Sequence, residues 1–593
     1  MCGIIGVALR RGNAAEEVFQ GLQRLEYRGY DSAGLTVMSE KGGLTTLKKG
    51  GRVANLQGGV QALVGATAIG HTRWATHGEP NDINAHPHVV GAFSVVHNGI
   101  IENFRELKDE LISLGEEFVS DTDSEVVARL INRYYSGDAL AAVSKAAARL
   151  KGSFALGVMC EKLSGIIAVK YKSPVVVGFG DKGVALSSDI PALPSWVSSV
   201  CVPEDGDIVL LTSQSARFYS GDLQPVNRVR RPILAGQFNQ GTGNYPHYML
   251  KEINETESTV RDTCDSVFRN VDIKKLTEYV RGADRIIITG CGTAYNAGLV
   301  ARRFFSDRCG VFCQAEIASE LRYLPVKVTG STLVLAISQS GETADTVEAV
   351  SALKERGARV VAVTNCGYSA ITRVAHMVVP VCAGAEVCVA ATKSYIGQLA
   401  ALYLIANLTS DVFTARSELL SVCGKINELL KGGAEKIAEK IALLCAKSSA
   451  VFFLGRGADY AVAVEASLKL KEVSYVFSDG YPAGELKHGT LALIDENTLS
   501  VIIICDETLA EKCENAVSQV ASRKGKVAVI TCLDGVAEKL CKGAEVWQIP
   551  SCPAELSPFV SAVALQLVAY KTAVILGRDP DKPRNLAKSV TVE

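Results

Sequence analysis

The sequence predicts an α/β protein whose C-terminal half contains two copies of one doubly wound, parallel-sheet domain. Three strand–loop units recur there at an offset of 165 or 166 residues. They pair 285–295 with 450–460, 331–338 with 497–504, and 360–366 with 526–532. A constant offset over several units indicates a duplicated domain. Continuous apolar strands separated by helical segments are typical of parallel sheets that helices cover on both faces.

Length and composition narrow the class of protein. A chain of 593 residues with 48% hydrophobic and 21% charged residues indicates several ordinary globular domains. A net charge of −1 gives no sign of a nucleic-acid or membrane-surface partner. No uninterrupted apolar run reaches 18 residues, and no secretory signal opens the chain. The 17 cysteines form no Cys-x-x-Cys pair, which predicts reduced thiols in a cytoplasmic protein.

The second residue, Cys2, is a candidate nucleophile. Loss of Met1 would give Cys2 a free α-amine, which titrates near pH 7.7–8.0 and can take the proton of a thiol that titrates near 8.5. The resulting thiolate could attack an amide carbon. The other interpretation is a small buried apolar residue, which is a common role for cysteine.

Five of the eight histidines fall between residues 71 and 97. They follow the apolar, strand-like runs 66–69 and 93–96 and stand among loop-forming residues. Polar groups at strand ends predict the rim of an active site. A histidine-rich metal site is the weaker interpretation, since no cysteine or carboxylate has zinc-like spacing with these residues.

Five stretches near the N-terminus carry a family resemblance. They are 2–6 (CGIIG), 25–34 (LEYRGYDSAG), 72–80 (TRWATHGEP), 97–99 (HNG) and 122–123 (TD). These stretches resemble the glutaminase half of the glutamine–fructose-6-phosphate aminotransferases, or glucosamine-6-phosphate synthases, which are N-terminal-nucleophile (Ntn) amidotransferases. The resemblance implies an αββα-layered Ntn-hydrolase domain over residues 2–231. It covers the whole chain, as the later motifs indicate.

The resemblance also implies roles for these residues. Cys2 would attack the glutamine side-chain amide, form a thioester and release ammonia. The Asn98 amide and the Gly99 N–H would form the oxyanion hole, since neutral donors suit charge that develops only in the intermediate. The expected glutamine-binding residues are Arg73 for the α-carboxylate, Asp123 for the α-ammonium, and Trp74, Thr76 and His77 in a closing loop. For Asp123, a helix N-cap before Ser124 is an equal interpretation.

A linker is predicted over residues 232–246, where the sequence is rich in Gly, Asn and Gln. A helical pattern follows from His247. Members of the family usually continue with Glu-Gln-Pro, whereas this chain has Glu255, Thr256 and Glu257. The details of this junction therefore stay open.

Glycines after two strands invite a dinucleotide interpretation. Gly290-x-Gly292 and Gly455-x-Gly457 match the start of that fingerprint, but Tyr295 and Tyr460 replace its third glycine. The pattern instead resembles the sugar isomerase (SIS) domain, expected over 247–430 for copy one and 431–580 for copy two.

The two copies differ in the loop after their second matched strand. Copy one has Ser-Gln-Ser-Gly-Glu-Thr over 338–343, and copy two has Asp506 and Leu509 in the matching loop. Hydroxyls and backbone N–H groups at a helix start form a phosphate cradle, whereas a carboxylate repels phosphate. An ordinary N-cap turn is the competing interpretation, but the asymmetry favours a sugar-phosphate site in copy one. The resemblance implies these contacts: Cys291, Gly292, Thr293, Ser338, Gln339, Ser340, Thr343, Val389, Ala391, Lys469 and Ala587.

The sugar chemistry is assigned by resemblance. Residues 465–472 follow a helical pattern that on its own predicts a solvated charged face. In the family, the residue matching Glu472 moves a proton between C1 and C2, and the one matching His488 opens the sugar ring from the neighbouring subunit of a homodimer. The C-terminal tail, 581–593, carries Lys588, whose family counterpart forms a Schiff base with open-chain fructose 6-phosphate.

The sequence therefore predicts a two-site enzyme. It would convert L-glutamine and fructose 6-phosphate to glucosamine 6-phosphate, the first step of hexosamine biosynthesis, with ammonia passing internally and with no cofactor or metal. Two other classes stay open: a different amidotransferase, which would need a diphosphate or ATP loop, and a non-enzymatic sugar-phosphate sensor. Ala294 and Ala391 replace residues that are often serine in the family.

Overall fold

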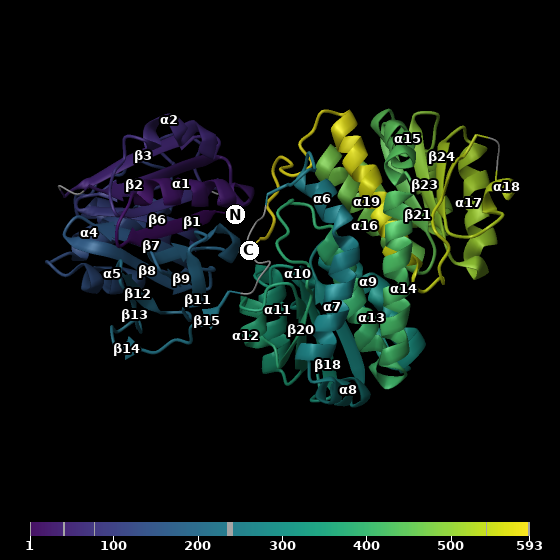
Figure 1. Cartoon of the computed structure of the whole chain (residues 1–593), viewed down its shortest axis with the longest axis horizontal. Helices are drawn as coiled ribbons and strands as arrows, with labels where there is room; N and C mark the ends of the chain where they lie inside the picture. The colour runs from purple at the N-terminus through teal and green to yellow at the C-terminus, as the bar shows by residue number, and fades with distance from the viewer. Residues whose placement is uncertain (1, 40–41, 76, 234–240, 541–542, 591–593) are drawn as a thin grey trace. The chain divides into compact units, whose positions relative to one another are not determined.

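The computed structural model describes every residue except 1, 40–41, 76, 234–240, 541–542 and 591–593 (Figure 1). The chain forms two compact units, residues 1–240 with 587–593, and residues 241–586. Most of the predicted linker thus falls at the boundary, although 234–240 lie outside the described residues. Each unit is described by itself.

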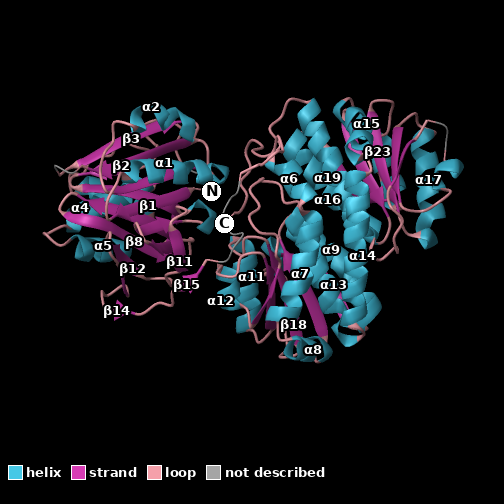
Figure 2. Ribbon diagram, viewed as in Figure 1, coloured by secondary structure: helices cyan, strands magenta, loops and turns pink. Residues whose placement is uncertain are grey.

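The first unit contains two antiparallel sheets packed face to face (Figure 2). One sheet has the order β15 (Arg231–Pro232), β11 (Val197–Cys201), β9 (Val176–Gly180), β10 (Gly183–Ser187), β1 (Gly3–Leu9), β4 (Thr67–Arg73), β2 (Ser32–Met38) and β3 (Leu44–Gly50). The other has the order β14 (Pro225–Val226), β13 (Ala216–Tyr219), β12 (Ile208–Leu211), β8 (Leu163–Tyr171), β7 (Gly152–Cys160), β6 (Phe93–Ile101) and β5 (His88–Val90).

Helices cover the outer faces of both sheets. Helix α1 (Ala14–Leu25) packs on β1 and β4, while α4 (Ser124–Tyr134) packs on β6 and α5 (Ala139–Ala147) on β8. The other α-helices among the described residues of this unit are α2 (Gln57–Val60) and α3 (Phe104–Ser113). Apolar side chains such as Ile4, Val96 and Met159 fill the space between the sheets. The predicted αββα layering is confirmed.

The second unit contains two parallel five-stranded sheets with the same topology. Copy one has the order β17 (Phe312–Ile317), β16 (Arg285–Gly290), β18 (Thr332–Ser338), β19 (Arg359–Thr364) and β20 (Met377–Pro380). Copy two has the order β22 (Ser478–Pro482), β21 (Ala450–Gly455), β23 (Thr498–Ile504), β24 (Lys526–Thr531) and β25 (Glu545–Gln548).

Helices bury both faces of these sheets, as the continuous apolar strands predicted. Ile286 and Ile288 face one core cluster, and Ile287 between them faces another. The helices are α6 (Tyr248–Asn254), α7 (Thr256–Asn270), α8 (Ile273–Arg281), α9 (Thr293–Cys309), α10 (Ala318–Leu321), α11 (Ala344–Glu355), α12 (Ala370–Val374), α13 (Lys393–Ala406), α14 (Val412–Lys431), α15 (Ala434–Ala446), α16 (Ala458–Ser474), α17 (Ala510–Ala521), α18 (Val536–Lys539) and α19 (Ser557–Ile575).

The duplication is confirmed, with one correction to its register. The predicted match of Val360 with Lys526 is wrong by one residue, because Val334 pairs with Val360 whereas the equivalent Ser500 pairs with Val527. The third strands therefore match at 167 residues. The apolar runs are too uniform to fix this register, which is set by hydrogen bonds.

One helix among the described residues, α19, is long and apolar enough to cross a membrane by length and composition. The sequence shows no uninterrupted apolar run here, because Ser, Pro, Gln and Lys are scattered through the helix. Its most apolar 18-residue window is 83% buried within the protein. That burial is typical of a core helix, and α19 packs against α15 and α16.

The departure at 255–257 does not interrupt the chain's path. Helices α6 and α7 are separated only by Glu255, whose carboxylate lies 2.7 Å from the Nζ of the buried Lys393. This ion pair ties the helical junction to the first turn of α13.

Candidate active sites

The Cys2 thiol lies against the backbone at the end of β4. The Trp74 N–H donates to Cys2 Sγ at 3.4 Å, and the thiol donates to the Trp74 carbonyl at 3.5 Å. Burial raises the pKa of the Cys2 thiol. At neutral pH such a thiol needs a nearby base to become a nucleophile.

Asn98 and Gly99 supply donors with unusual geometry. Asn98 is buried, and within the described part of the chain neither side-chain polar atom of Asn98 has a hydrogen-bond partner. Gly99 has φ +122°, and a Cβ there would lie 1.8 Å from the Ser153 carbonyl oxygen. Only glycine fits this close approach, and an unpartnered buried amide suits a charge that appears transiently.

Arg73 is buried at the end of β4. Its guanidinium donates to the carbonyls of Gly78 at 3.1 Å and Glu79 at 3.3 Å, and also to that of His77. Trp74 packs edge-on against Tyr30, with ring centroids 5.7 Å apart. Thr76 lies outside the described residues. The backbone of residues 77–79 therefore folds around the Arg73 side chain.

Asp123 occupies the N-cap position of α4 but makes no capping hydrogen bond with its side chain. Its buried carboxylate instead accepts from the Ile101 N–H at 2.9 Å. The N-cap interpretation is thus wrong for the side chain. This bond joins Asp123 to the strand that carries Asn98 and Gly99.

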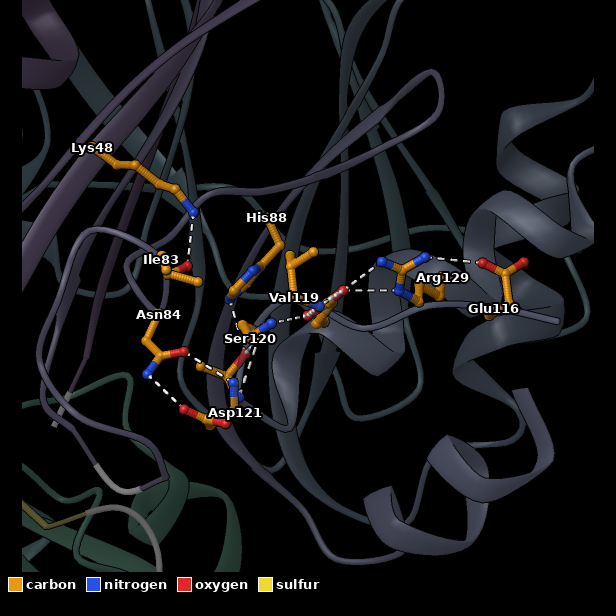
Figure 3. Close-up of polar contacts among 11 residues, drawn as sticks. Lys48, Ile83, Asn84, His88, Glu116, Val119, Ser120, Asp121 and Arg129 are labelled. Carbon is orange, nitrogen blue, oxygen red and sulfur yellow. Dashed lines mark hydrogen bonds and ion pairs between the residues drawn. The ribbon is translucent and has the colours of Figure 1, made fainter. Parts of the chain in front are cut away.

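The loop before Asp123 is held by a polar network (Figure 3). The Glu125 carboxylate accepts from the N–H groups of Val119 at 3.1 Å and Ser120 at 2.7 Å, and it pairs with Arg129. From another segment, Asn84 Oδ1 accepts from the Asp121 N–H at 2.9 Å. The position of Asp123 is therefore fixed from both sides.

Four of the five histidines between residues 71 and 97 are buried and do not lie on an exposed loop rim. The predicted strands continue further than their apolar runs, so His71 lies within β4 and His97 within β6. His71 Nε2 lies 2.8 Å from the His97 carbonyl, and the ring of His86 lies between those of His71 and His88, at 4.1 and 4.6 Å. These four rings are buried. No group of three His, Cys, Asp or Glu side chains among the described residues could hold a metal ion.

We expect the fold of the first unit to weaken as the pH falls below about 6.5. Burial lowers the pKa of His71 and of His88 to about 3, and also lowers the pKa of His86 and of His97. Below about pH 6.5 the histidines of the unfolded chain therefore bind protons, whereas the buried rings of the native state stay neutral. The stability present above pH 6.5 should fall by up to about 1.4 kcal/mol per pH unit for each of His71 and His88, down toward pH 3. His86 and His97 contribute in the same direction.

Hydrogen exchange of the full chain between pH 7 and 5, corrected for the intrinsic pH dependence, measures this effect. Amides of β4 and β6 should lose protection faster than those of β18 in the second unit, which serve as the internal control. Parallel loss in both units would contradict the assignment to the buried histidines.

A buried arginine that bonds to the Cys2 backbone was not predicted from the sequence. Arg28 Nε donates to the Cys2 carbonyl at 3.2 Å, and the guanidinium pairs with Asp189 at 3.1 Å. Arg28 stands in the stretch 25–34, which carries the family resemblance, but the sequence assigned no role to this residue. Asp189, 161 residues later, gave no such signal.

In copy one, two loops meet at one edge of the sheet, because the parallel strands β16 and β18 pair directly. At the end of β18, Ser338 Oγ accepts from the Gly341 N–H at 3.0 Å and lies 3.2 Å from Thr343 Oγ1. After β16, Gly292 has φ +53° and α9 begins with Thr293. This edge collects hydroxyls and helix starts, which suits a phosphate.

Copy two has carboxylates in the loop after β23 and in the first turn of α16. Asp506 Oδ1 accepts from the N–H and the hydroxyl of Thr508, at 3.0 and 2.6 Å. Buried Asp459 accepts from the Cys505 N–H at 2.9 Å, and burial raises the pKa of Asp459 to about 7. In copy one the matching residue is Ala294. The protein's own carboxylates thus bond to donors that a phosphate would need.

A buried charge cluster joins the two copies where α9 meets α16. Lys469 Nζ lies 2.6 Å from Glu472, 3.5 Å from Glu465 and 2.9 Å from Thr293 Oγ1. Glu465 also accepts from Asn296 at 2.7 Å. Lys469 and Glu465 are 1% and 2% exposed, so the prediction of a solvated charged face is wrong.

Burial controls the charge of this cluster. It raises the pKa of Glu465 to about 7, near the working range of a proton-transfer group. Burial alone would lower the pKa of Lys469, but Glu472 and Glu465 outweigh it and raise that pKa. Lys469 therefore stays cationic beside Glu472.

The remaining predicted residues are spread over both units. His488 is exposed at the end of a short 3₁₀ helix, Glu485–His488. Val389 donates its N–H to the Asp581 carbonyl at 3.1 Å, so the tail begins against the loop that also contains Ala391. Ala587 and Lys588 group with the first unit, and the other predicted sugar contacts group with the second.

Two family models match the chain. The glutamine amidotransferase domain model matches residues 71–195, and the SIS domain model matches residues 279–408 and 443–576. Curated relatives match over 100% of both chains. The glutamine–fructose-6-phosphate aminotransferase (isomerizing) of Clostridium tetani is 40% identical over 615 residues, and that of Aquifex aeolicus is 42% identical over 604.

Solved structures resemble the C-terminal part. The C-terminal domain of glucosamine-fructose-6-phosphate aminotransferase from Francisella tularensis has a TM-score of 0.54 and 32% identity, covering 58% of this chain and 100% of that chain. Tagatose-6-phosphate ketose/aldose isomerase from Escherichia coli has a TM-score of 0.52 at 17% identity, covering 57% of this chain and 95% of that one. The second likeness shows the fold alone.

Proposed function

The chain belongs to the glutamine–fructose-6-phosphate aminotransferase family, and we propose that it converts L-glutamine and D-fructose 6-phosphate to L-glutamate and D-glucosamine 6-phosphate. The domains are the glutaminase over 2–231, SIS copies over 247–430 and 431–580, and the catalytic tail over 581–593. The observation that carries the proposal is the presence in one chain of two features. One is the half-buried Cys2 thiol in a unit whose Asn98 amide has no hydrogen-bond partner among the described residues, and the other is a hydroxyl-lined loop in copy one.

At the first site, the Cys2 α-amine takes the thiol proton after Met1 is removed. The thiolate attacks the glutamine side-chain carbon, and the Asn98 amide and Gly99 N–H stabilise the oxyanion. Collapse of the tetrahedral intermediate expels ammonia and leaves a thioester that water hydrolyses to glutamate. Arg73 and Asp123 hold the α-carboxylate and the α-ammonium, and Trp74, Thr76 and His77 close over the substrate.

At the second site, Ser338, Ser340 and Thr343 donate to the sugar phosphate. Further contacts come from Cys291, Gly292, Thr293, Gln339, Val389, Ala391, Lys469 and Ala587. His488 of a neighbouring subunit in a homodimer opens the ring, and the Lys588 amine forms a Schiff base at C2. Ammonia, passed internally, replaces the lysine, and Glu472 moves the proton from C1 to C2. The enzyme would act in the cytoplasm and catalyse the first step of hexosamine biosynthesis.

A single assay tests this proposal. The chain is incubated with glutamine and fructose 6-phosphate, and glutamate and glucosamine 6-phosphate are measured by mass spectrometry. Both products should form in equal amounts, and omission of glutamine should abolish both. Glutamate release without the amino sugar would favour a different amidotransferase. Binding of fructose 6-phosphate with neither product would favour a sensor.

We expect the double variant Ser338→Ala with Thr343→Ala to raise KM for fructose 6-phosphate about tenfold or more, because phosphate oxygens lose hydroxyl donors. The matched change in copy two, Asp506→Asn with Leu509→Ala, should leave KM nearly unchanged. Steady-state kinetics at saturating glutamine measures both. Equal effects from the two pairs would contradict the asymmetry between the copies.

A further inference from the structure

Helix α16 ends on a residue with an unfavourable backbone conformation. Tyr475 has φ +65°, in the left-handed region, at the C-cap. In copy one the matching helix α9, 165 residues earlier, ends on Gly310 with φ +62°. Glycine is the usual residue there because a Cβ is strained in this conformation. A strained tyrosine in place of glycine indicates that the tyrosine side chain makes interactions that offset the strain.

That side chain holds the beginning of the C-terminal tail. The Arg584 N–H donates to the Tyr475 hydroxyl at 2.7 Å. The guanidinium groups of Arg584 and Arg578 lie 4.5 and 5.3 Å from the centre of the Tyr475 ring. Both distances are within cation–π range. Three contacts therefore converge on one tyrosine.

The same segment is fixed at two other places in the second unit. The Asp581 carboxylate accepts from the N–H groups of Tyr248 and Met249, at 2.8 and 2.7 Å, at the start of α6. The Asp581 carbonyl accepts from the Val389 N–H at 3.1 Å. Of these three anchoring points, Tyr475 lies nearest the free end, since Arg584 stands only four residues before Lys588.

We propose that Tyr475 is a positioning residue for the sugar chemistry, which clamps the tail four residues before Lys588 to the end of the helix that carries Glu472. The inference rests on the proposed roles of Lys588 and Glu472. Glu472 precedes Tyr475 by three residues, so one hydrogen bond separates the two catalytic segments. A terminal segment otherwise frays. The clamp limits the positions that the Lys588 amine samples and so raises its effective concentration at the C2 carbonyl.

Two variants of Tyr475 test the clamp. Tyr475→Phe keeps the ring and loses the acceptor oxygen, and Tyr475→Gly loses both while relieving the backbone strain at the helix end. The control is Lys524→Gly, which relieves the same backbone strain at an exposed residue elsewhere, also with φ +65°. Borohydride trapping of fructose 6-phosphate on the C-terminal peptide and hydrogen exchange over 580–586 are measured for all three.

Tyr475→Phe should slow trapping and lower kcat/KM for amination about fivefold, and Tyr475→Gly about tenfold or more. Amides of 580–586 should exchange faster in both. Glutaminase activity without sugar should match the wild type, and Lys524→Gly should change none of these quantities. Tyr475→Gly removes the backbone strain at the end of the helix. If Tyr475 had only a structural role there, this variant should therefore neither slow trapping nor speed exchange over 580–586.

Failure of the clamp is distinguishable from failure of the proposed function. Unchanged exchange over 580–586 in both Tyr475 variants would contradict the clamp. Faster exchange with wild-type trapping would show that the clamp does not serve the chemistry. A wild-type adduct on a lysine other than Lys588 would overturn the proposed role of Lys588, and the inference with it.

Discussion

Cys2→Ala is expected to abolish glutamine-dependent amination, with a loss on the order of 10⁴-fold or more, because no other group supplies the nucleophile. The thiol lies between the N–H and the carbonyl of Trp74, and alanine leaves that backbone in place. Slow isomerisation of fructose 6-phosphate to glucose 6-phosphate should survive, since it needs only the second site. Mass spectrometry of both sugar products measures the two activities in one experiment.

A matched control for this variant is Cys201→Ala, which removes a different thiol, a buried one, from the same unit. It should keep glutamine-dependent activity. Two results would refute the role of Cys2: amino sugar made from glutamine by the Cys2→Ala variant, or Met1 still attached to the mature, active wild-type chain.

Lys588→Arg should block the sugar chemistry by at least about 10³-fold while preserving charge. An arginine stays protonated at any working pH and cannot attack the C2 carbonyl. Borohydride should trap fructose 6-phosphate on the wild-type C-terminal peptide and not on the variant. Basal glutaminase activity should persist, although its stimulation by sugar phosphate should weaken.

The control for the tail is Lys582→Arg, a lysine six residues earlier in the same segment. It should retain trapping and amination. An adduct found on Lys469 or Lys487 would move the Schiff base. Lys469 is a poor candidate on physical grounds, since Glu472 and Glu465 raise its pKa and keep it protonated.

The pattern of apolar runs predicted the parallel sheets of the second unit well, because both faces of those strands are buried. The same pattern ended β4 and β6 too early. His71 and His97 are polar yet lie within strands, where they meet across the space between the two sheets. Hydropathy cannot reveal a polar side chain whose partner is supplied by another sheet.

The candidate sites were predicted where a motif placed the residues close together in the sequence. Long-range partners escaped this reasoning. Glu465 and Lys469 look like a solvated face because their partners Thr293 and Asn296 stand about 170 residues away, on α9. Asp123 was ambiguous for a related reason, since only the fold shows that its carboxylate bonds to Ile101 rather than to α4.

The bond from Asp581 to the start of α6 also has a consequence for synthesis of the chain. The Tyr248 N–H finds its partner 333 residues later, so the first turn of that helix cannot be completed on a nascent chain. At about 5–20 residues per second, the ribosome needs roughly 17 to 67 s to cover that distance. Both sheets of the first unit, by contrast, are fully synthesised by residue 232. The second unit can therefore complete this contact only after nearly the whole chain has been made.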